Sequence, residues 1–323
     1  MPASQASIEL PILDISQPLS PSSLSSLSVA CREWGFFLLC NHGISTELHK
    51  KVQSLSSRIF MLPPEVKLQA GHSLYTPHFI ASPFYECIKV SGPNFFASAQ
   101  SSSEAILNEP YSDFCDTLQE YGSIMTKLSK RIVEILLMCL GEDGSGRKLS
   151  SEFDKCEGYF RINNYSSLET DYQSKKLLRE EDEVECLGMH TDMSSITIVY
   201  QDEMGGLQVR SKEGKWMDVN PRKGNILVVN IGDLMQAWSN GKLRSSEHRV
   251  VLRRRPKRYS VSFFWSFEEE KVIFAPDEIV GRGNLRLYRP FLCADYMRYR
   301  ENSEKGKFEK VGYTVQHFAG INN

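Results

Sequence analysis

Three residues in the second half of the chain have side chains that bind transition metals: His190, Asp192 and His248. Residues i and i+2 of a strand point to the same face, so His190 and Asp192 can reach one ion together. Several strand-length segments precede His248, which is enough chain to return to the same place. Two imidazoles and one carboxylate leave three positions of an octahedral ion open, as in non-haem iron(II) oxygenases. Alone, His-x-Asp is a weak signal, because surface pairs of this kind are common.

A candidate site for a dicarboxylate follows a short distance after His248. Arg258 and Ser260 are two residues apart at the start of an apolar segment, so as strand residues they share a face. The planar guanidinium group can bind a carboxylate through two parallel hydrogen bonds. The other end of the molecule, if it is a 2-oxo acid, can chelate the iron. The alternative is that Arg258 is one more cation of the neighbouring basic turn, and from its position alone this alternative is preferred.

The elements that must position these residues differ between the two halves of the chain. The first half has helical periodicity at Gln17–Ser28 (which leads into Trp34), Thr46–Phe60 and Ser112–Leu140, and a buried strand at Phe36–Cys40. An amphipathic helix is preferred to low complexity for the Ser-rich segment Gln17–Ser28. Residues 71–110 are irregular and are expected to form a long loop that covers a site. The second half predicts short strands at Phe160–Asn163, Ser195–Tyr200, Leu207–Val209, Trp216–Val219, Ile226–Asn230, Val250–Leu252 and Ser260–Trp265.

Helices followed by many short strands predict an α+β fold, in which amino-terminal helices pack on a two-sheet β-sandwich or jelly roll. Residues 1–155 are expected to form the helical and mixed region, and residues 156–323 the β-rich core. Neither half has the pattern of a region that buries its own apolar surface, so the two are expected to form one functional unit.

Composition excludes several other classes of function. The formal net charge of −2 gives no electrostatic reason to expect nucleic acid or an acidic membrane surface as partner. No window approaches the ~18 consecutive apolar residues of a membrane span. Eight scattered cysteines and a polar start predict a cytoplasmic protein with reduced thiols. The basic run Arg253–Arg255 could be a nuclear signal, so a nuclear location stays open, but a solvated hairpin turn is preferred. No obligate protein partner is indicated.

Taken in order, the motifs of this chain resemble the plant 2-oxoglutarate-dependent dioxygenases. The matching segments are Trp34–Phe37, Asn41–Gly43, Arg161–Tyr165, His190–Asp192, Gly205–Val209, Gly214–Trp216, Val228–Asp233, Trp238–Gly241, His248–Val250 and Arg258–Ser260. They extend over nearly the whole chain.

The resemblance implies a double-stranded β-helix core in which His190, Asp192 and His248 bind iron(II). It also implies that Arg258 and Ser260 bind the distal carboxylate of 2-oxoglutarate, with Asn163 and Tyr165 nearby. The cofactors expected are therefore Fe(II) and, as co-substrate, 2-oxoglutarate, with ascorbate supporting activity. Dioxygen and a small organic molecule are the expected partners. Hydroxylation is the default outcome, while desaturation and ring closure remain open.

The nearest branch of this family is that of the gibberellin oxidases and gibberellin 20-oxidase-like proteins. This implies a small hydrophobic plant metabolite as substrate, with a gibberellin or related diterpenoid acid as the first candidate. A flavonoid, alkaloid or other specialised metabolite is the alternative within the class. A non-catalytic metal-binding or small-molecule-binding module, or a cupin-type isomerase, is the alternative outside it. Neither of these needs both the metal triad and the Arg-x-Ser motif.

Two segments depart from the family pattern, and both concern the substrate pocket. Tyr165 is followed by Ser166-Ser167-Leu168 where many relatives have Pro-Pro-Cys, and residues 75–100 lack the usual Gly-Tyr-Gly pattern. Aromatic side chains here and after the Arg-x-Ser motif are predicted to line the pocket: Phe79, Phe84, Tyr85, Phe264 and Trp265. His42, His49, His72, His78 and His317 are interpreted as turn, surface or packing residues.

Overall fold

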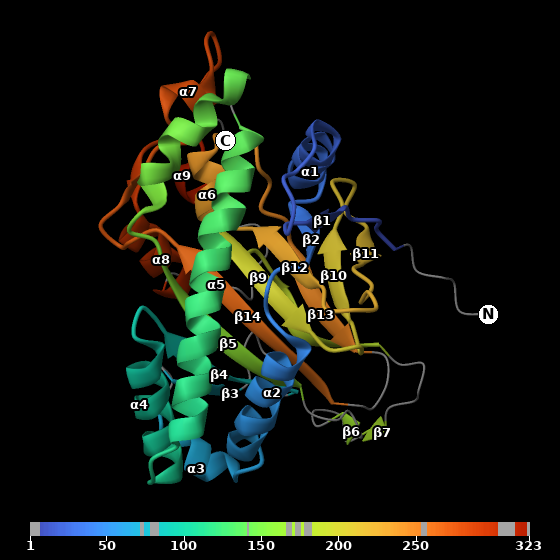
Figure 1. Ribbon diagram of the computed structural model, residues 1–323, viewed down its shortest axis with the longest axis vertical. Coiled ribbons are helices and arrows are strands. Elements are labelled where there is room, and N and C mark those ends of the chain that lie inside the picture. Colours follow the sequence, from blue (N-terminus) through green and yellow to red (C-terminus); the bar gives the residue numbers. More distant parts are fainter. Residues whose placement is uncertain are drawn as a thin grey trace, which may run out of the picture.

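Two β-sheets form the centre of the molecule (Figure 1). The computed structural model describes residues 7–71, 74–77, 84–140, 142–165, 170–171, 176–177, 183–252, 257–302 and 314–321. The larger sheet has eight strands in the order β1 (Ile12–Asp14), β2 (Phe36–Cys40), β12 (Leu227–Ile231), β9 (Ile196–Gln201), β14 (Arg258–Ser266), β5 (Glu157–Tyr165), β4 (Tyr85–Ser91) and β3 (Tyr75–Pro77). The smaller sheet has four strands in the order β11 (Trp216–Asp218), β10 (Leu207–Arg210), β13 (His248–Leu252) and β8 (Val184–His190).

All neighbours in these two sheets are antiparallel except β1 and β2. Two short pairs lie outside them: β6 (Thr170–Asp171) with β7 (Lys176–Leu177), and β15 (Val272–Ile273) with β16 (Phe291–Leu292). The expected α+β fold with a jelly-roll core is therefore confirmed. Strands β1 to β4, from residues 1–155, lie in the same sheet as β5, β9, β12 and β14.

Helices cover the outer face of the larger sheet. The longest, α5 (Ser112–Met138), crosses that face in Figure 1, beside α2 (Thr46–Phe60) and α4 (Phe95–Leu107). Its buried stripe packs in one apolar core with the outward side chains of β5 and β14: Phe114, Leu118, Met125, Ile132, Phe160, Ile162, Val261 and Phe263. The remaining helices are α1 (Pro21–Glu33), α3 (Pro64–Leu68), a 3-10 helix at Glu142–Phe153, α6 (Asp233–Trp238), α7 (Asp277–Val280), α8 (Cys293–Asn302) and α9 (Val315–Ala319).

Residues 71–110 do not form the long loop expected from the sequence. Where the structure describes them, they contain β3, β4 and the thirteen-residue helix α4. The side chain of Asn94 caps α4 by accepting a hydrogen bond from the backbone N–H of Ala97 at 3.0 Å. The serines of this segment make the helix difficult to recognise from the sequence, because their hydroxyls compete with the backbone for hydrogen-bond partners. Here those of Ser101 and Ser102 donate to carbonyls one turn earlier, at 3.0 and 2.9 Å.

Some sequence expectations lie outside the described residues: the hairpin at Arg253–Arg255, the position of Phe79 and the interpretations of His72 and His78. In the part of the chain that is described, no helix combines the length and apolar character needed to span a membrane.

Candidate active site

A cavity lies between the two sheets. The larger sheet contributes alternate residues of β5 and β14, and the smaller sheet contributes residues of β8, β10 and β13. The residues that line it are Phe36, Tyr85, Tyr159, Arg161, Asn163, Tyr165, Leu187, His190, Asp192, Met193, Thr197, Val199, Leu207, Asn230, His248, Val250, Arg258, Ser260, Ser262 and Phe264. The metal triad and the Arg-x-Ser motif, which are far apart in the sequence, thus share one cavity.

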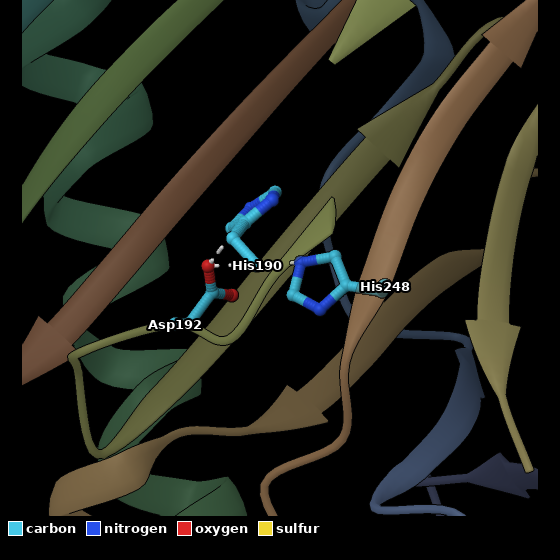
Figure 2. Close-up of side chains that lie close together, drawn as sticks. All are labelled: His190, Asp192 and His248. Atoms are coloured by element: carbon cyan, nitrogen blue, oxygen red, sulfur yellow. Dashed lines mark ion pairs between the residues drawn. The ribbon is translucent and has the colours of Figure 1, made fainter. Parts of the chain in front are cut away.

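The three predicted metal-binding side chains converge in this cavity. His190 is the last residue of β8 and His248 the first of β13, and the two are direct partners across the antiparallel pair. Figure 2 shows both rings and the Asp192 carboxylate pointing toward one another. Asp192 Oδ1 lies 3.6 Å from His190 Nε2 and 3.7 Å from His248 Nε2. The sequence predicts that His190 and Asp192 belong to one strand, whereas β8 ends at His190 and Asp192 lies in the following loop.

Hydrogen bonds orient each of the three side chains. One possible metal-donor atom of each side chain is left facing the other two side chains. His190 Nδ1 lies 2.7 Å from the carbonyl of Gly188, and His248 Nδ1 lies 3.0 Å from that of Ser246. A carbonyl only accepts, so both Nδ1 atoms carry the proton and both Nε2 atoms keep their lone pairs.

The Asp192 carboxylate is oriented by hydrogen bonds to Oδ2, the oxygen that does not face the imidazoles. Oδ2 accepts hydrogen bonds from Thr197 Oγ1 at 2.6 Å and from Asn230 Nδ2 at 2.7 Å. The strands β9 and β12, which carry these donors, are neighbours in the larger sheet. Oδ1 therefore remains as the donor atom that faces the two imidazoles.

Charge states follow from this environment. Burial, reinforced by the neighbouring His248, lowers the pKa of His190, so its imidazole is neutral at neutral pH. Burial acts to raise the pKa of Asp192, but the two histidines and the hydrogen bonds from Thr197 and Asn230 outweigh it, and the net pKa is lowered. The neutral imidazole of His190, the ionised carboxylate of Asp192 and the imidazole of His248 are a donor set that fits a divalent iron ion.

A buried ionic network, which was not predicted from the sequence, anchors the loop that carries Asp192. Arg300 Nη1, on α8, lies 2.5 Å from Asp233 Oδ2, and its Nη2 donates to the carbonyl of Thr191 at 3.0 Å. The backbone N–H of Asp233 donates to the carbonyl of Asp192 at 2.8 Å. The hydroxyl of Tyr296 donates to Asp233 Oδ2 at 2.5 Å. The helix α8 therefore fixes the position of the loop that carries Asp192.

Tyr296→Phe is expected to lower the free energy of unfolding by about 1.5–3 kcal/mol, because it removes a buried hydrogen bond to a charged group. Urea unfolding followed by tryptophan fluorescence measures this loss. An unchanged midpoint and slope would show that the hydroxyl adds nothing to the network of Asp233 and Arg300.

Arg258 is buried at the other end of the cavity, with 2% of its surface exposed. Its guanidinium group donates to the carbonyl of Gly205 at 2.6 Å, to Gln201 Oε1 at 3.2 Å and to Ser260 Oγ at 3.2 Å. It also lies over the ring of Tyr165, 4.7 Å from the centroid. Within the described part of the chain, no carboxylate forms an ion pair with it. A buried cation with only neutral partners fits a site for an anion, and the surface-turn alternative is thereby wrong.

Asn163 and Tyr165 lie beside this cation, on the cavity face of β5. Asn163 Nδ2 donates to the hydroxyls of Ser260 and Ser262, both at 3.2 Å, and Asn163 Oδ1 accepts from the hydroxyl of Tyr85 at 2.8 Å. Cross-strand pairing places Tyr165 opposite Arg258 and Asn163 opposite Ser260. All four predicted co-substrate residues are therefore neighbours.

The aromatic residues predicted to line the substrate pocket separate into two groups. Tyr85 and Phe264 line the cavity, and the ring of Phe264 stacks on Tyr159 at 4.8 Å between centroids. Phe84 and Trp265 do not line it. Trp265 follows Phe264 in β14, so it points to the opposite face and packs with Phe263 in the core under the helices. Phe84 is buried in a separate cluster with Cys186 and Leu252.

Two further cavity residues, Arg161 and Tyr159, were missed at the sequence level. The signal was present, because both share the face of β5 with Asn163 and Tyr165 by the period-two rule.

This combination of fold and site is that of an iron- and 2-oxoglutarate-dependent oxygenase. Residues 158–266 match the 2OG-Fe(II) oxygenase superfamily, and residues 10–86 match the family described as non-haem dioxygenase in morphine synthesis N-terminal. The chain belongs to the 2OG-Fe(II) oxygenases, and it is a dioxygenase that uses Fe(II), 2-oxoglutarate and dioxygen on a small molecule.

Similar proteins lie among the gibberellin-related members of the family. A gibberellin 20-oxidase-like protein of Arabidopsis thaliana is 53% identical, with 98% of each chain covered. Gibberellin 3-beta-dioxygenase 4 of Arabidopsis thaliana is 31% identical, covering 90% of this chain and 81% of its own length. The crystal structure of JOX2 in complex with 2OG, Fe and JA superposes with a TM-score of 0.74 at 26% identity, over 93% of this chain and 87% of that chain.

Proposed function

We propose that His190, Asp192 and His248 hold the iron(II), that Arg258 and Ser260 hold the distal carboxylate of 2-oxoglutarate, and that the enzyme oxidises a gibberellin or a related diterpenoid acid. The observation that carries the site assignment is the convergence of three metal donors in the same cavity as a buried arginine with neutral partners. When bound, iron and 2-oxoglutarate supply the oxidising chemistry, in which dioxygen is consumed and 2-oxoglutarate becomes succinate and carbon dioxide.

The protein's own residues orient the reactants and exclude water. The Nδ1 hydrogen bonds of His190 and His248 fix both rings, so that their Nε2 atoms need no rearrangement to bind a metal. Thr197 and Asn230 hold the Asp192 carboxylate in one rotamer. Ser260 connects Arg258 to Asn163, and Asn163 connects to Tyr85, so one hydrogen-bonded chain positions the co-substrate end of the cavity.

The substrate assignment is supported by the relatives whose names contain gibberellin. Hydroxylation is the proposed outcome. Desaturation and ring closure are the alternatives, and each needs only a different fate for the same oxidised carbon. A flavonoid, alkaloid or other specialised metabolite remains the alternative substrate. Ascorbate is proposed to support activity. The eight free cysteines support a reducing, cytoplasmic location.

The test has two stages. Anaerobic titration of the protein with iron(II) and then 2-oxoglutarate should develop the weak visible charge-transfer band that reports the bidentate chelate. A metabolite screen coupled to succinate release, beginning with gibberellins, then identifies the substrate. Absence of the band would overturn the site assignment, whereas a band with no stimulation by any gibberellin would overturn the substrate assignment alone.

Phe264→Ala is expected to weaken turnover of the substrate while slow uncoupled decarboxylation of 2-oxoglutarate continues, because Phe264 lines the cavity outside the co-substrate end. Phe263→Ala is the matched control. Its ring lies on the opposite face of β14 in the core, and its removal should lower the free energy of unfolding by about 3–5 kcal/mol. Equal loss of coupled and uncoupled activity in Phe264→Ala would contradict a role in substrate binding.

A further inference from the structure

The larger sheet carries a second arginine, half-buried, four residues from the co-substrate end of the cavity. Arg161 lies on β5 between Tyr159 and Asn163, and its side chain lines the cavity. The alternating residues Phe160 and Ile162 point the other way, into the core under the helices. On the neighbouring strand β4, Lys89 is the direct cross-strand partner of Arg161. The two cations thus lie side by side on one face of the larger sheet.

The groups around Arg161 with which it interacts include a thiol and two phenols. Its Nη1 lies 3.4 Å from Cys87 Sγ. The phenols are those of Tyr85 and Tyr159, and burial raises the pKa of both, so they are neutral at neutral pH. Lys89 lies over the Tyr159 ring, with Nζ 4.9 Å from the centroid.

The neighbouring Arg161 disfavours the protonated form of Lys89. Burial lowers its pKa and Arg161 lowers it further, against smaller opposing effects of Glu301, Cys87 and Glu269. Like charges directly opposite each other in a sheet are destabilising. A bound anion at this point would remove that repulsion.

This pair is distinct from the 2-oxoglutarate anchor. In the register of β5 and β14, Arg258 is paired with Tyr165, and Arg161 is paired with Ser262. Arg161 and Tyr165 are four residues apart along β5, a separation of roughly 13 Å at the rise of a strand. Arg161 also adjoins the stacked rings of Tyr159 and Phe264. Tyr159 and Arg161 line the same cavity as the metal triad.

We propose that Arg161, assisted by Lys89, binds the carboxylate of an acidic substrate, while the rings of Tyr159 and Phe264 contact its apolar body. The inference rests on the proposed function, and it narrows the substrate class to apolar carboxylic acids. Neutral flavonoids and alkaloids lack the group that this pair recognises. The guanidinium fork of Arg161 matches the two oxygens of one carboxylate, and Lys89 adds a second, adjustable charge.

The experiment compares acids with their methyl esters. Anaerobic protein loaded with iron(II) and 2-oxoglutarate is titrated calorimetrically with a panel of apolar monocarboxylic acids, a gibberellin included, and with the methyl ester of each. Wild type should bind at least one acid more than tenfold more tightly than its ester. Arg161→Gln should weaken binding of that acid by about thirtyfold or more and remove its advantage over the ester. Lys89→Gln should have a smaller effect in the same direction.

The controls separate this inference from the proposed function. Iron and 2-oxoglutarate binding, followed by the charge-transfer band, should be unchanged in Arg161→Gln, and Arg131→Gln on the exposed side of α5 should match wild type in every titration. Arg161→Lys keeps the charge and provides a second folded variant that should retain part of the preference for acids. The inference is overturned if no acid exceeds its ester in wild type, if the preference survives in Arg161→Gln, or if that variant loses 2-oxoglutarate instead.

Discussion

Replacing His248 with alanine is expected to abolish succinate release from 2-oxoglutarate. His248 provides one of only three convergent donors of the triad, and its Nε2 faces Asp192 Oδ1 at 3.7 Å. Loss of an outer partner of a metal ligand typically reduces affinity or activity by about 10–100-fold, so loss of a ligand itself should exceed that range. His190→Ala should behave in the same way, since the two rings are equivalent partners across β8 and β13.

The measurement is succinate release with added iron(II) and ascorbate, beside an anaerobic iron titration of each variant. His317→Ala, on the exposed side of α9, is the matched control and should retain wild-type turnover. Asp192→Gly should also abolish hydroxylation, although the vacated position could admit a halide. Near-wild-type turnover by His248→Ala with iron in excess would remove this residue from the metal site.

The convergence of the proposed metal and co-substrate residues in one cavity was predictable because it follows local rules. The rule that residues i and i+2 of a strand share a face placed Arg258 with Ser260, and both line the cavity. His190 and Asp192 converge although only His190 belongs to a strand, because the loop is held by Asp233 and Arg300. Arg300 lies more than a hundred residues from that loop, on α8, and no local pattern indicates its partner.

The same rule would have corrected one prediction. Phe264 and Trp265 are adjacent in β14 and therefore point to opposite faces, so they cannot both line the cavity. Phe84, which precedes β4, does not line the cavity, whereas Tyr85 lines it and donates a hydrogen bond to Asn163. Arg161 belongs to a segment that matches the family pattern, but its proposed role depends on the register between β4 and β5, which pairs it with Lys89. The register between strands that are distant in the sequence is set by tertiary structure. It cannot be read from the alternation of side chains along one strand.

The helix α4 was missed for a different reason. Its sequence combines serines, which have modest helix propensity, with a capping asparagine at each end. Asn108 ends the helix with a left-handed φ of 54°. Tertiary packing of Phe95, Ala99 and Ile106 in the core stabilises a segment whose local preference is weak.

Replacing Arg258 with lysine is expected to raise the apparent constant for 2-oxoglutarate strongly while iron binding stays intact. Removing one partner of a desolvated charge pair typically costs about 2–5 kcal/mol, which corresponds to roughly thirtyfold to several-thousandfold in affinity. Lysine keeps the charge but lacks the fork that donates to Gly205, Gln201 and Ser260 together. Ser260→Ala should be milder, at about 1.5–3 kcal/mol for one hydrogen bond to a charged group.

The anchor can be tested from the ligand side as well, because the predicted contact is with the distal carboxylate alone. A 2-oxo acid that lacks this carboxylate should bind wild type poorly, and Arg258→Ala should bind it about as well as wild type does. Arg131→Lys on α5 provides the matched exposed substitution and should leave the constant for 2-oxoglutarate unchanged. The comparison requires an apparent constant for each co-substrate with each variant, beside an anaerobic iron titration. If Arg258→Lys bound 2-oxoglutarate like wild type, the distal carboxylate would have to be held elsewhere. The buried guanidinium group would then serve to join Gly205 of the loop before β10 to β9 and β14.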